Sequence, residues 1–282
     1  WRDAAEGAAR LEHWLRERCT GASWEVASCG LWRVWSLFYV GDLVELERCV
    51  SLFLRDAEER GDLYAATNFR TGLATTAWLM RDDPAGAREE ARTALARWSR
   101  QGYHTQHWLG FSTEAMIALY EGDVAAARAH IAQQWPALRR SLLMRVQAVR
   151  VEALLFRARA ALAAARDPGA APALLRAATR DARRVRRERT RWTAPLADLV
   201  EAGVAACAGD RAQAVAHLEA AIRGFDAADM ALYLIAARYR LGEVQGGEAG
   251  AALTRAARAW LEAQRVRNPA RFVTMLAPGF DD

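Results

Sequence analysis

The chain has 282 residues, of which 52% are hydrophobic and 26% are charged, and these proportions are typical of a soluble globular protein. No run of about 18 uncharged apolar residues occurs, which excludes a membrane-spanning helix and gives no reason to expect a membrane partner. All 39 basic residues are arginine, so the net charge of +5 is explained by an arginine-rich codon bias and does not favour nucleic acid as a partner.

The chain begins at Trp1 in helix-like sequence, with no basic segment followed by an apolar one that would mark a signal peptide. We therefore expect it to be part of a longer, cytoplasmic protein. Its four cysteines are scattered and form no C-x-x-C pair, which fits small core residues in a reducing compartment. We expect no metal and no cofactor.

Helical periodicity runs along the whole chain, and no long segment alternates apolar and polar residues as a strand would. Turn signals recur at a nearly constant interval, with Asp residues spaced 40, 41, 44 and 43 apart, at Asp42, Asp82, Asp123, Asp167 and Asp210. In most of these turns, a Gly that can end one helix precedes the Asp that caps the next. A period of this size predicts stacked helical hairpins.

In chain order, residues 1–20 are predicted as the second helix of a truncated hairpin, and six complete hairpins follow. The first helices are expected at 23–40, 62–81, 102–121, 142–165, 191–208 and 227–242. The second helices are expected at 43–60, 84–101, 123–140, 169–188, 210–224 and 247–266. Residues 267–282 are expected to close the array as a capping helix, with Asn268 as its cap, Pro269 in the first turn and a stop at Pro278-Gly279.

The hairpin pattern predicts an all-α fold in which residues 1–282 form one repeat array. The motif G-D-x-x-x-A, followed by an Ala-rich helix, resembles tetratricopeptide repeats with somewhat longer helices. This resemblance implies a right-handed superhelical solenoid of antiparallel hairpins, in which the first helices line a concave groove.

The triplet Arg60-Gly61-Asp62 matches a cell-adhesion motif, but it falls where the repeat predicts a turn. We interpret Gly61 as the end of one helix and Asp62 as the cap of the next.

A polar stripe follows this turn, with Tyr64, Asn68, Thr71 and Thr75 spaced to share one face of the predicted helix. Shifted by one repeat, this face continues at His104 and His107, and the next first helix adds Arg145. The stripe could bind a peptide in the groove, or its members could bond to each other and to the adjacent helix. Arg145 could hold a carboxylate or phosphate, or pair with Glu152 on its own helix. The two histidines lack a third ligand, so a metal site is not favoured.

A basic run, RDARRVRRERTR at 180–191, contains a candidate docking patch at Arg183, Arg184, Arg186 and Arg187. The alternative is the solvated end of a long helix, where cations suit the negative helix terminus. Most tryptophans sit at helical spacing and are predicted to pack between helices, with Trp98 and Trp135 filling spaces between hairpins: Trp24, Trp32, Trp35, Trp78, Trp98, Trp108 and Trp135.

Several segments together resemble the tetratricopeptide-like C-terminal region of large bacterial serine/threonine protein kinases of the myxobacterial kind. They are GDLYAATNFRTG, ARWSRQGYHTQHW, QQWPALRRSLLMRVQAVRVEALLFRARAALA and NPARFVTMLAPGF. The resemblance implies a non-catalytic interaction and regulatory region, partnered by a protein, a peptide or the parent's own kinase or ATPase-like domains. The chain has no Gly-rich kinase loop, H-R-D, D-F-G or phosphate-binding lysine motif, so we expect no enzyme activity from it. The alternative is the ligand-sensing repeat domain of an ATPase-linked, LuxR-type transcription regulator.

Overall fold

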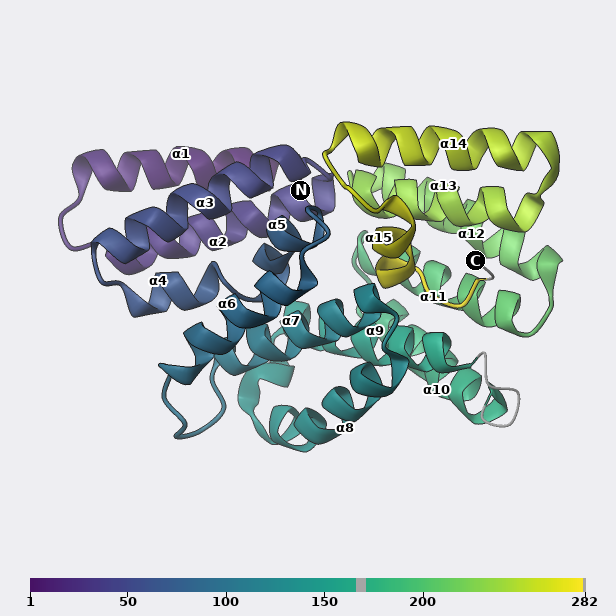
Figure 1. Ribbon diagram of the computed structural model, residues 1–282, viewed down its shortest axis with the longest axis horizontal. Coiled ribbons are helices and arrows are strands. Elements are labelled where there is room, and N and C mark those ends of the chain that lie inside the picture. Colours follow the sequence, from purple (N-terminus) through teal and green to yellow (C-terminus); the bar gives the residue numbers. More distant parts are fainter. Residues whose placement is uncertain (166–170, 281–282) are drawn as a thin grey trace.

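The computed structural model describes residues 1–165 and 171–280, and all regular structure in these two segments is helical (Figure 1). The first helices of the hairpins are surrounded by other helices, and most of their residues are buried: α2 (Ser23–Val40), α7 (Thr105–Glu121), α9 (Gln147–Ala164), α11 (Thr193–Cys207) and α13 (Ala231–Gln245). Neighbours in sequence pack against each other along the chain, as expected for a helical repeat.

The second helices lie outside this layer and bury only one face: α1 (Arg2–Arg18), α3 (Leu43–Glu59), α6 (Pro84–Ala96), α8 (Val124–Arg140), α10 (Ala171–Arg186), α12 (Arg211–Ala227) and α14 (Gly247–Ala263). The buried face of α6 consists of Ala87, Ala91 and Ala94, which repeat at helical spacing. Small side chains at these positions allow close approach to the first helices.

The predicted Gly-Asp turns are confirmed where the structure describes them. Gly41 has a φ of 83°, and Asp42 accepts the backbone N–H of Glu45 at 3.1 Å. The same arrangement recurs at Gly122-Asp123 and Gly209-Asp210. It also recurs at Gly61-Asp62, so the RGD triplet forms a helix boundary.

One predicted cap is wrong by a residue. Asp83, rather than Asp82, caps α6 by accepting the N–H of Gly86 at 2.9 Å. Pro84 then occupies the first turn of the helix, where a missing N–H costs nothing. Asp82 instead takes a left-handed conformation with a φ of 56°. The predicted turn at Asp167 lies outside the described residues.

The continuous helix predicted at 62–81 is broken. It consists of α4 (Leu63–Asn68), a 3-10 turn η1 (Gly72–Thr75) and α5 (Thr76–Leu79). Thr71 is extended and Gly72 has a φ of 65°, a conformation that costs little only for glycine. A Cβ on Gly72 would lie 2.5 Å from Leu109 of α7, so the break lets α7 approach the backbone.

The helix predicted at 142–165 is also divided. A 3-10 turn η2 (Leu142–Arg145) ends at Val146, whose extended backbone separates it from α9. The predicted cap of the array is confirmed in α15 (Pro269–Leu276), where Asn268 accepts the N–H of Arg271 at 3.3 Å.

The first and last hairpins of the chain contact each other (Figure 1). Trp1 stacks on Tyr39 of α2 with ring centroids 4.3 Å apart, and its other neighbour is Trp192, from the turn before α11. The N–H of Leu43 donates to Gln264 at 3.0 Å, from just beyond α14. Helix α2 packs directly against α13, and α15 packs against α7. The first and last hairpins are therefore in direct contact. We call this contact the closure.

A buried polar network lies where the two ends join. Tyr39 of α2 donates a hydrogen bond to Glu152 of α9, and Arg159 of the same helix donates to Tyr233 of α13 at 2.8 Å. All four side chains are at most 4% exposed, so water cannot replace these hydrogen bonds. Burial raises the pKa of Glu152 and raises that of Tyr233 to about 12.

The described helices include none that is both long and apolar enough to cross a membrane.

The closure predicts that Gly→Ala substitutions at two helix ends lower the free energy of unfolding by different amounts. Gly41 and Gly122 each end a helix with a positive φ, but only Gly41 lies at the closure, where an added Cβ would be 2.6 Å from Trp260. Gly122→Ala should lower the free energy of unfolding by about 1–2 kcal/mol through backbone strain alone. Gly41→Ala should cost roughly 1–3 kcal/mol more because it also overpacks the closure.

Urea denaturation of both variants, followed by circular dichroism, measures this difference. Equal losses of stability would contradict the closure contact between the α2–α3 turn and α14.

Candidate functional site

The predicted polar stripe is mostly buried. Thr71 and Thr75 are fully buried, and Thr75 contacts Thr113 of α7. The Thr113 hydroxyl accepts the N–H of Gly72 at 2.7 Å, lies 3.0 Å from the Thr75 hydroxyl and donates to the carbonyl of Leu109. Thr71 donates to the carbonyl of Thr67. These hydroxyls replace the backbone bonds that are lost where the helix breaks, so they serve packing between hairpins.

Asn68 is also buried, and its side-chain oxygen accepts a hydrogen bond from Gln106 of α7 at 3.1 Å. The predicted sharing of one helical face by Asn68, Thr71 and Thr75 is wrong, because the helix ends between them. These three residues are not open to a partner. The alternative interpretation, bonding within the stripe and to the adjacent helix, describes their positions.

The remaining members of the stripe lie at the surface near the start of α7. Tyr64 is half-buried beside Trp98, with ring centroids 6.5 Å apart. The Trp98 ring N–H donates to Nδ1 of His104 at 3.1 Å, and the backbone N–H of His104 donates to Nδ1 of His107 at 2.9 Å. The hydrogen bond between His104 and His107 is part of a capping box at the start of α7.

A cleft opens beside this cap, between the loop that follows α6 and the end of α8. Its volume is about 500 Å³. We define the cleft by its lining residues: Gly102, Tyr103, Ala137, Arg140, Ser141, Leu142 and Leu143. Leu142 is 69% exposed and the nearby Val146 is 50% exposed, so large apolar side chains face solvent at this site. Burial raises the pKa of Tyr103 to about 12, which keeps its hydroxyl neutral.

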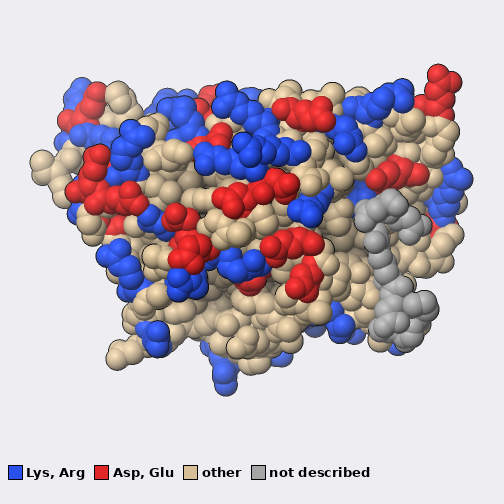
Figure 2. Space-filling view, viewed as in Figure 1, with Lys and Arg blue, Asp and Glu red and all other residues tan. Residues whose placement is uncertain are grey.

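The cleft lies in a part of the chain without acidic residues. Residues 91–113 and 124–151 contain no Asp or Glu. Four exposed arginines lie in or next to the cleft, and none of them forms an ion pair with a described residue: Arg100, Arg139, Arg140 and Arg145. On the face drawn in Figure 2, the lower edge, where α8 lies in Figure 1, shows basic and uncharged residues.

A continuous helix would place Arg145 and Glu152 on the same face, but the structure does not. Arg145 is exposed in η2, whereas Glu152 is buried and bonded to Tyr39. The ion pair of this region is instead formed by Arg150, which donates to Glu188 at 2.6 Å. The side chain of Arg145 is therefore exposed beside the cleft.

The predicted basic patch is divided between solvent and an internal network. Arg183, Arg184 and Arg187 are exposed near the end of α10. Arg186 is half-buried and donates to Asp198 at 2.8 Å and to Glu201, both on α11. This end of α10 has the features of both interpretations, a solvated basic helix terminus and a charged surface.

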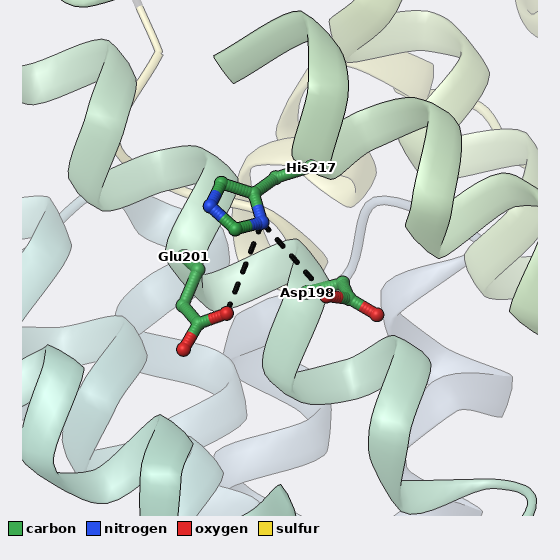
Figure 3. Close-up of side chains that lie close together, drawn as sticks. All are labelled: Asp198, Glu201 and His217. Carbon is green, nitrogen blue, oxygen red and sulfur yellow. Dashed lines mark ion pairs between the residues drawn. The ribbon is translucent and has the colours of Figure 1, made fainter. Parts of the chain in front are cut away.

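Next to Arg186 lies a cluster of two carboxylates and a histidine that the sequence did not predict. His217 of α12 faces Asp198 and Glu201, with its Nδ1 3.8 Å from an oxygen of each (Figure 3). The three side chains could each offer one ligand atom to a metal ion. The signal was present as Asp and Glu three residues apart, but the histidine comes from a different helix and only the fold brings it close.

The position of Arg186 favours an ion-pair network over a metal site in this cluster. Its guanidinium bonds to both carboxylates and supplies the positive charge that a metal would otherwise supply. Burial alone would lower the pKa of Arg186, but the hydrogen bonds and negative charges of Asp198 and Glu201 raise it. The four side chains therefore form a satisfied ion-pair network that joins α10, α11 and α12.

The expectation that the named tryptophans lie in the core is wrong for two of them. Trp24 is 61% exposed and Trp32 is 54% exposed, both on α2. Trp35 and Trp108 are buried and pack together with ring centroids 5.4 Å apart. Trp135 is covered by the guanidinium of Arg157 at 3.9 Å from the ring centroid.

No family model, no curated protein and no solved structure matches this chain.

The network at Arg186 predicts a gain of metal binding when the arginine is removed. In Arg186→Ala the two carboxylates and His217 lose their internal cation, so we expect the affinity for zinc to rise by roughly tenfold or more over the original chain. Competition with a chromophoric chelator measures the affinity. The double variant Arg186→Ala, His217→Ala serves as the control and should lose the gain. Equal zinc affinity with and without Arg186 would contradict the assignment.

Two histidines predict that stability falls in mild acid. Burial lowers the pKa of His130, whose Nε2 lies 3.1 Å from the carbonyl of Phe111, and burial also lowers the pKa of His107. Since the folded pKa values lie below the ordinary 6.5, both groups favour the folded state above that pH, and this contribution is lost as pH falls through the folded values.

Nuclear magnetic resonance titration should place the midpoint of His130 below 6.5. His130→Gln, which keeps a donor for Phe111, should show a smaller loss of unfolding free energy between neutral pH and mild acid than the original chain. A midpoint at or above the ordinary value would contradict the burial argument.

Proposed function

We propose that this chain is a non-catalytic protein-interaction and regulatory region that binds its partner at the cleft. The observation that carries the proposal is the exposure of Leu142 and Val146 at the rim of a cleft of about 500 Å³. Exposed large apolar side chains grouped at a concavity mark binding sites on soluble proteins, because leaving them in water has a free-energy cost that binding removes.

The location of the cleft agrees with this role. Its walls come from the loop after α6 and the end of α8, so the backbone of two consecutive hairpins positions it. The histidine cap holds the loop against α7. A site built between neighbouring hairpins senses their relative position, and a partner that prefers one arrangement would shift the population toward it.

The identity of the parent is proposed from sequence resemblance alone. We infer that the chain is the tetratricopeptide-like region of a bacterial, cytoplasmic serine/threonine protein kinase, in which phosphoryl transfer and ATP binding belong to other domains. The regular Gly-Asp turns and the packing of consecutive hairpins support a right-handed superhelical repeat array. The partner could then be a separate protein or the parent's own kinase or ATPase-like domains.

The alternative, a small-molecule sensor of a LuxR-type regulator, has less support from the described interior. Two enclosed sites lie next to Arg159 in the described interior, and they have volumes of about 10 and about 0 Å³. Neither site has room for a ligand larger than a water molecule.

Affinity capture with defined surface variants tests the protein-binding proposal. The tagged chain is compared with the double variant Leu142→Asp, Val146→Asp. The proteins that each retains are quantified by mass spectrometry. Both substitutions are on exposed residues, so the fold should be kept. Leu52→Asp is the matched control, because Leu52 is 45% exposed on α3, away from the cleft.

We expect at least one protein that is retained by the original chain and the Leu52 variant and lost from the double variant. If every retained protein is recovered equally by the double variant, the cleft is not the binding site and the proposal fails.

A further inference from the structure

We propose that the cleft binds an extended, acidic peptide segment that inserts one bulky apolar side chain between Tyr103 and Leu142. This inference rests on the proposed function, since it specifies the chemistry of the partner at the same site.

The charge around the cleft is uncompensated. Arg140 lines the cleft, and Arg100, Arg139 and Arg145 lie within three residues of its lining residues. The guanidinium groups of these four arginines form no ion pair or hydrogen bond with a described residue, whereas those of Arg70 and Arg88, on neighbouring hairpins, each bridge two glutamates. The cleft thus keeps several guanidinium groups available, and each can hold a carboxylate through two parallel N–H donors.

Glu188, the acidic partner of Arg150, is already engaged. Glu188 accepts hydrogen bonds from Arg150 at 2.6 Å and from Gln147 at 3.2 Å. These hydrogen bonds from Arg150 and Gln147 lower the pKa of Glu188 and keep it ionised. It does not neutralise the exposed arginines at the cleft rim, so an acidic partner would meet a net positive surface.

The shape of the cleft selects an apolar anchor. Leu142, Leu143, Ala137 and the ring of Tyr103 form its apolar wall. The volume of about 500 Å³ lies within the range of roughly 300–1,000 Å³ for small-molecule pockets, so it has room for one large side chain of a peptide. A Leu or Phe side chain of a peptide would bury this wall and place the flanking carboxylates near the arginines.

A peptide fits these features better than nucleic acid or an anionic membrane. A single-stranded nucleic acid would need exposed aromatic faces for stacking, but the Tyr103 ring is half-buried and its hydroxyl is fully enclosed. A membrane surface is flat, and the apolar wall of the cleft is concave. Both remain outcomes that the test can detect.

Fluorescence anisotropy with defined peptides tests the inference on the whole chain. The probe is a fluorescein-labelled peptide in which Leu and Phe are flanked by Asp and Glu residues. Its amide counterpart replaces each acid by Asn or Gln, and its polar counterpart replaces Leu and Phe by Ser. We expect saturable binding of the acidic-apolar peptide only, with an affinity that falls as salt concentration rises.

Matched charge variants locate the site. Arg140→Gln, Arg145→Gln should weaken binding by about threefold to tenfold, as expected for two exposed ion pairs. Arg55→Gln, Arg238→Gln removes the same charge from exposed positions on α3 and α13 and should leave the affinity unchanged. Leu142→Asp should abolish binding of the probe.

Each alternative outcome overturns the inference in a recognisable way. Equal binding of the amide peptide would reject the acidic partner while leaving protein binding at the cleft intact. Equal weakening by both arginine pairs would show non-specific charge attraction. Binding of a labelled oligothymidylate or of phosphatidylserine vesicles, lost in Arg140→Gln, Arg145→Gln and without binding of the acidic peptide, would assign the cleft to those partners. If the captured protein depends on Leu142 but no acidic peptide binds, only the inference on charge fails.

Discussion

Glu152 and Arg159 lie two turns apart on α9, in the middle of the molecule, and neither can remain in the interior without a hydrogen-bonding partner. Their partners come from opposite ends of the chain, Tyr39 from the first hairpin and Tyr233 from the last. Joining the two ends therefore satisfies the polar groups of the central helix. The stacking of Trp1 on Tyr39 and the contacts of α15 complete the same joint.

This joint determines where function can be located. An open array would offer the faces of its first helices to a partner, but here α2, α7, α9, α11 and α13 are enclosed. Exposed concave surface is left at positions where hairpins begin and end, such as the cleft. The cleft beside Tyr103 is such a position, and its arginines have no internal acids to neutralise them, unlike Arg186 with its two carboxylates.

Features set by local chemistry could be predicted from the sequence. The helix ends at Gly41, Gly61 and Gly122 follow from glycine and from the capping aspartate that comes next. Asp83 could also have been identified as a cap, because a Pro directly follows it. The break at Gly72 could not, since its cause is the approach of Leu109 from another hairpin. For the same reason, the burial of Thr71 and Thr75 and the grouping of His217 with Asp198 and Glu201 depended on helices distant in sequence.

The contact between Arg2 and Asp229 joins residues 227 positions apart, and the contact between Leu43 and Gln264 joins residues 221 positions apart. Open repeat arrays consist of local contacts, so their hairpins can form and unfold in sequence, and terminal units can be removed with modest loss. In this chain the last hairpin has to be made before the first can complete its packing. Folding is thereby coupled across the whole length and slowed by the entropy of bringing the ends together. The joint converts a modular sequence into one cooperative unit, in which a disturbance at either terminus reaches the central helix directly.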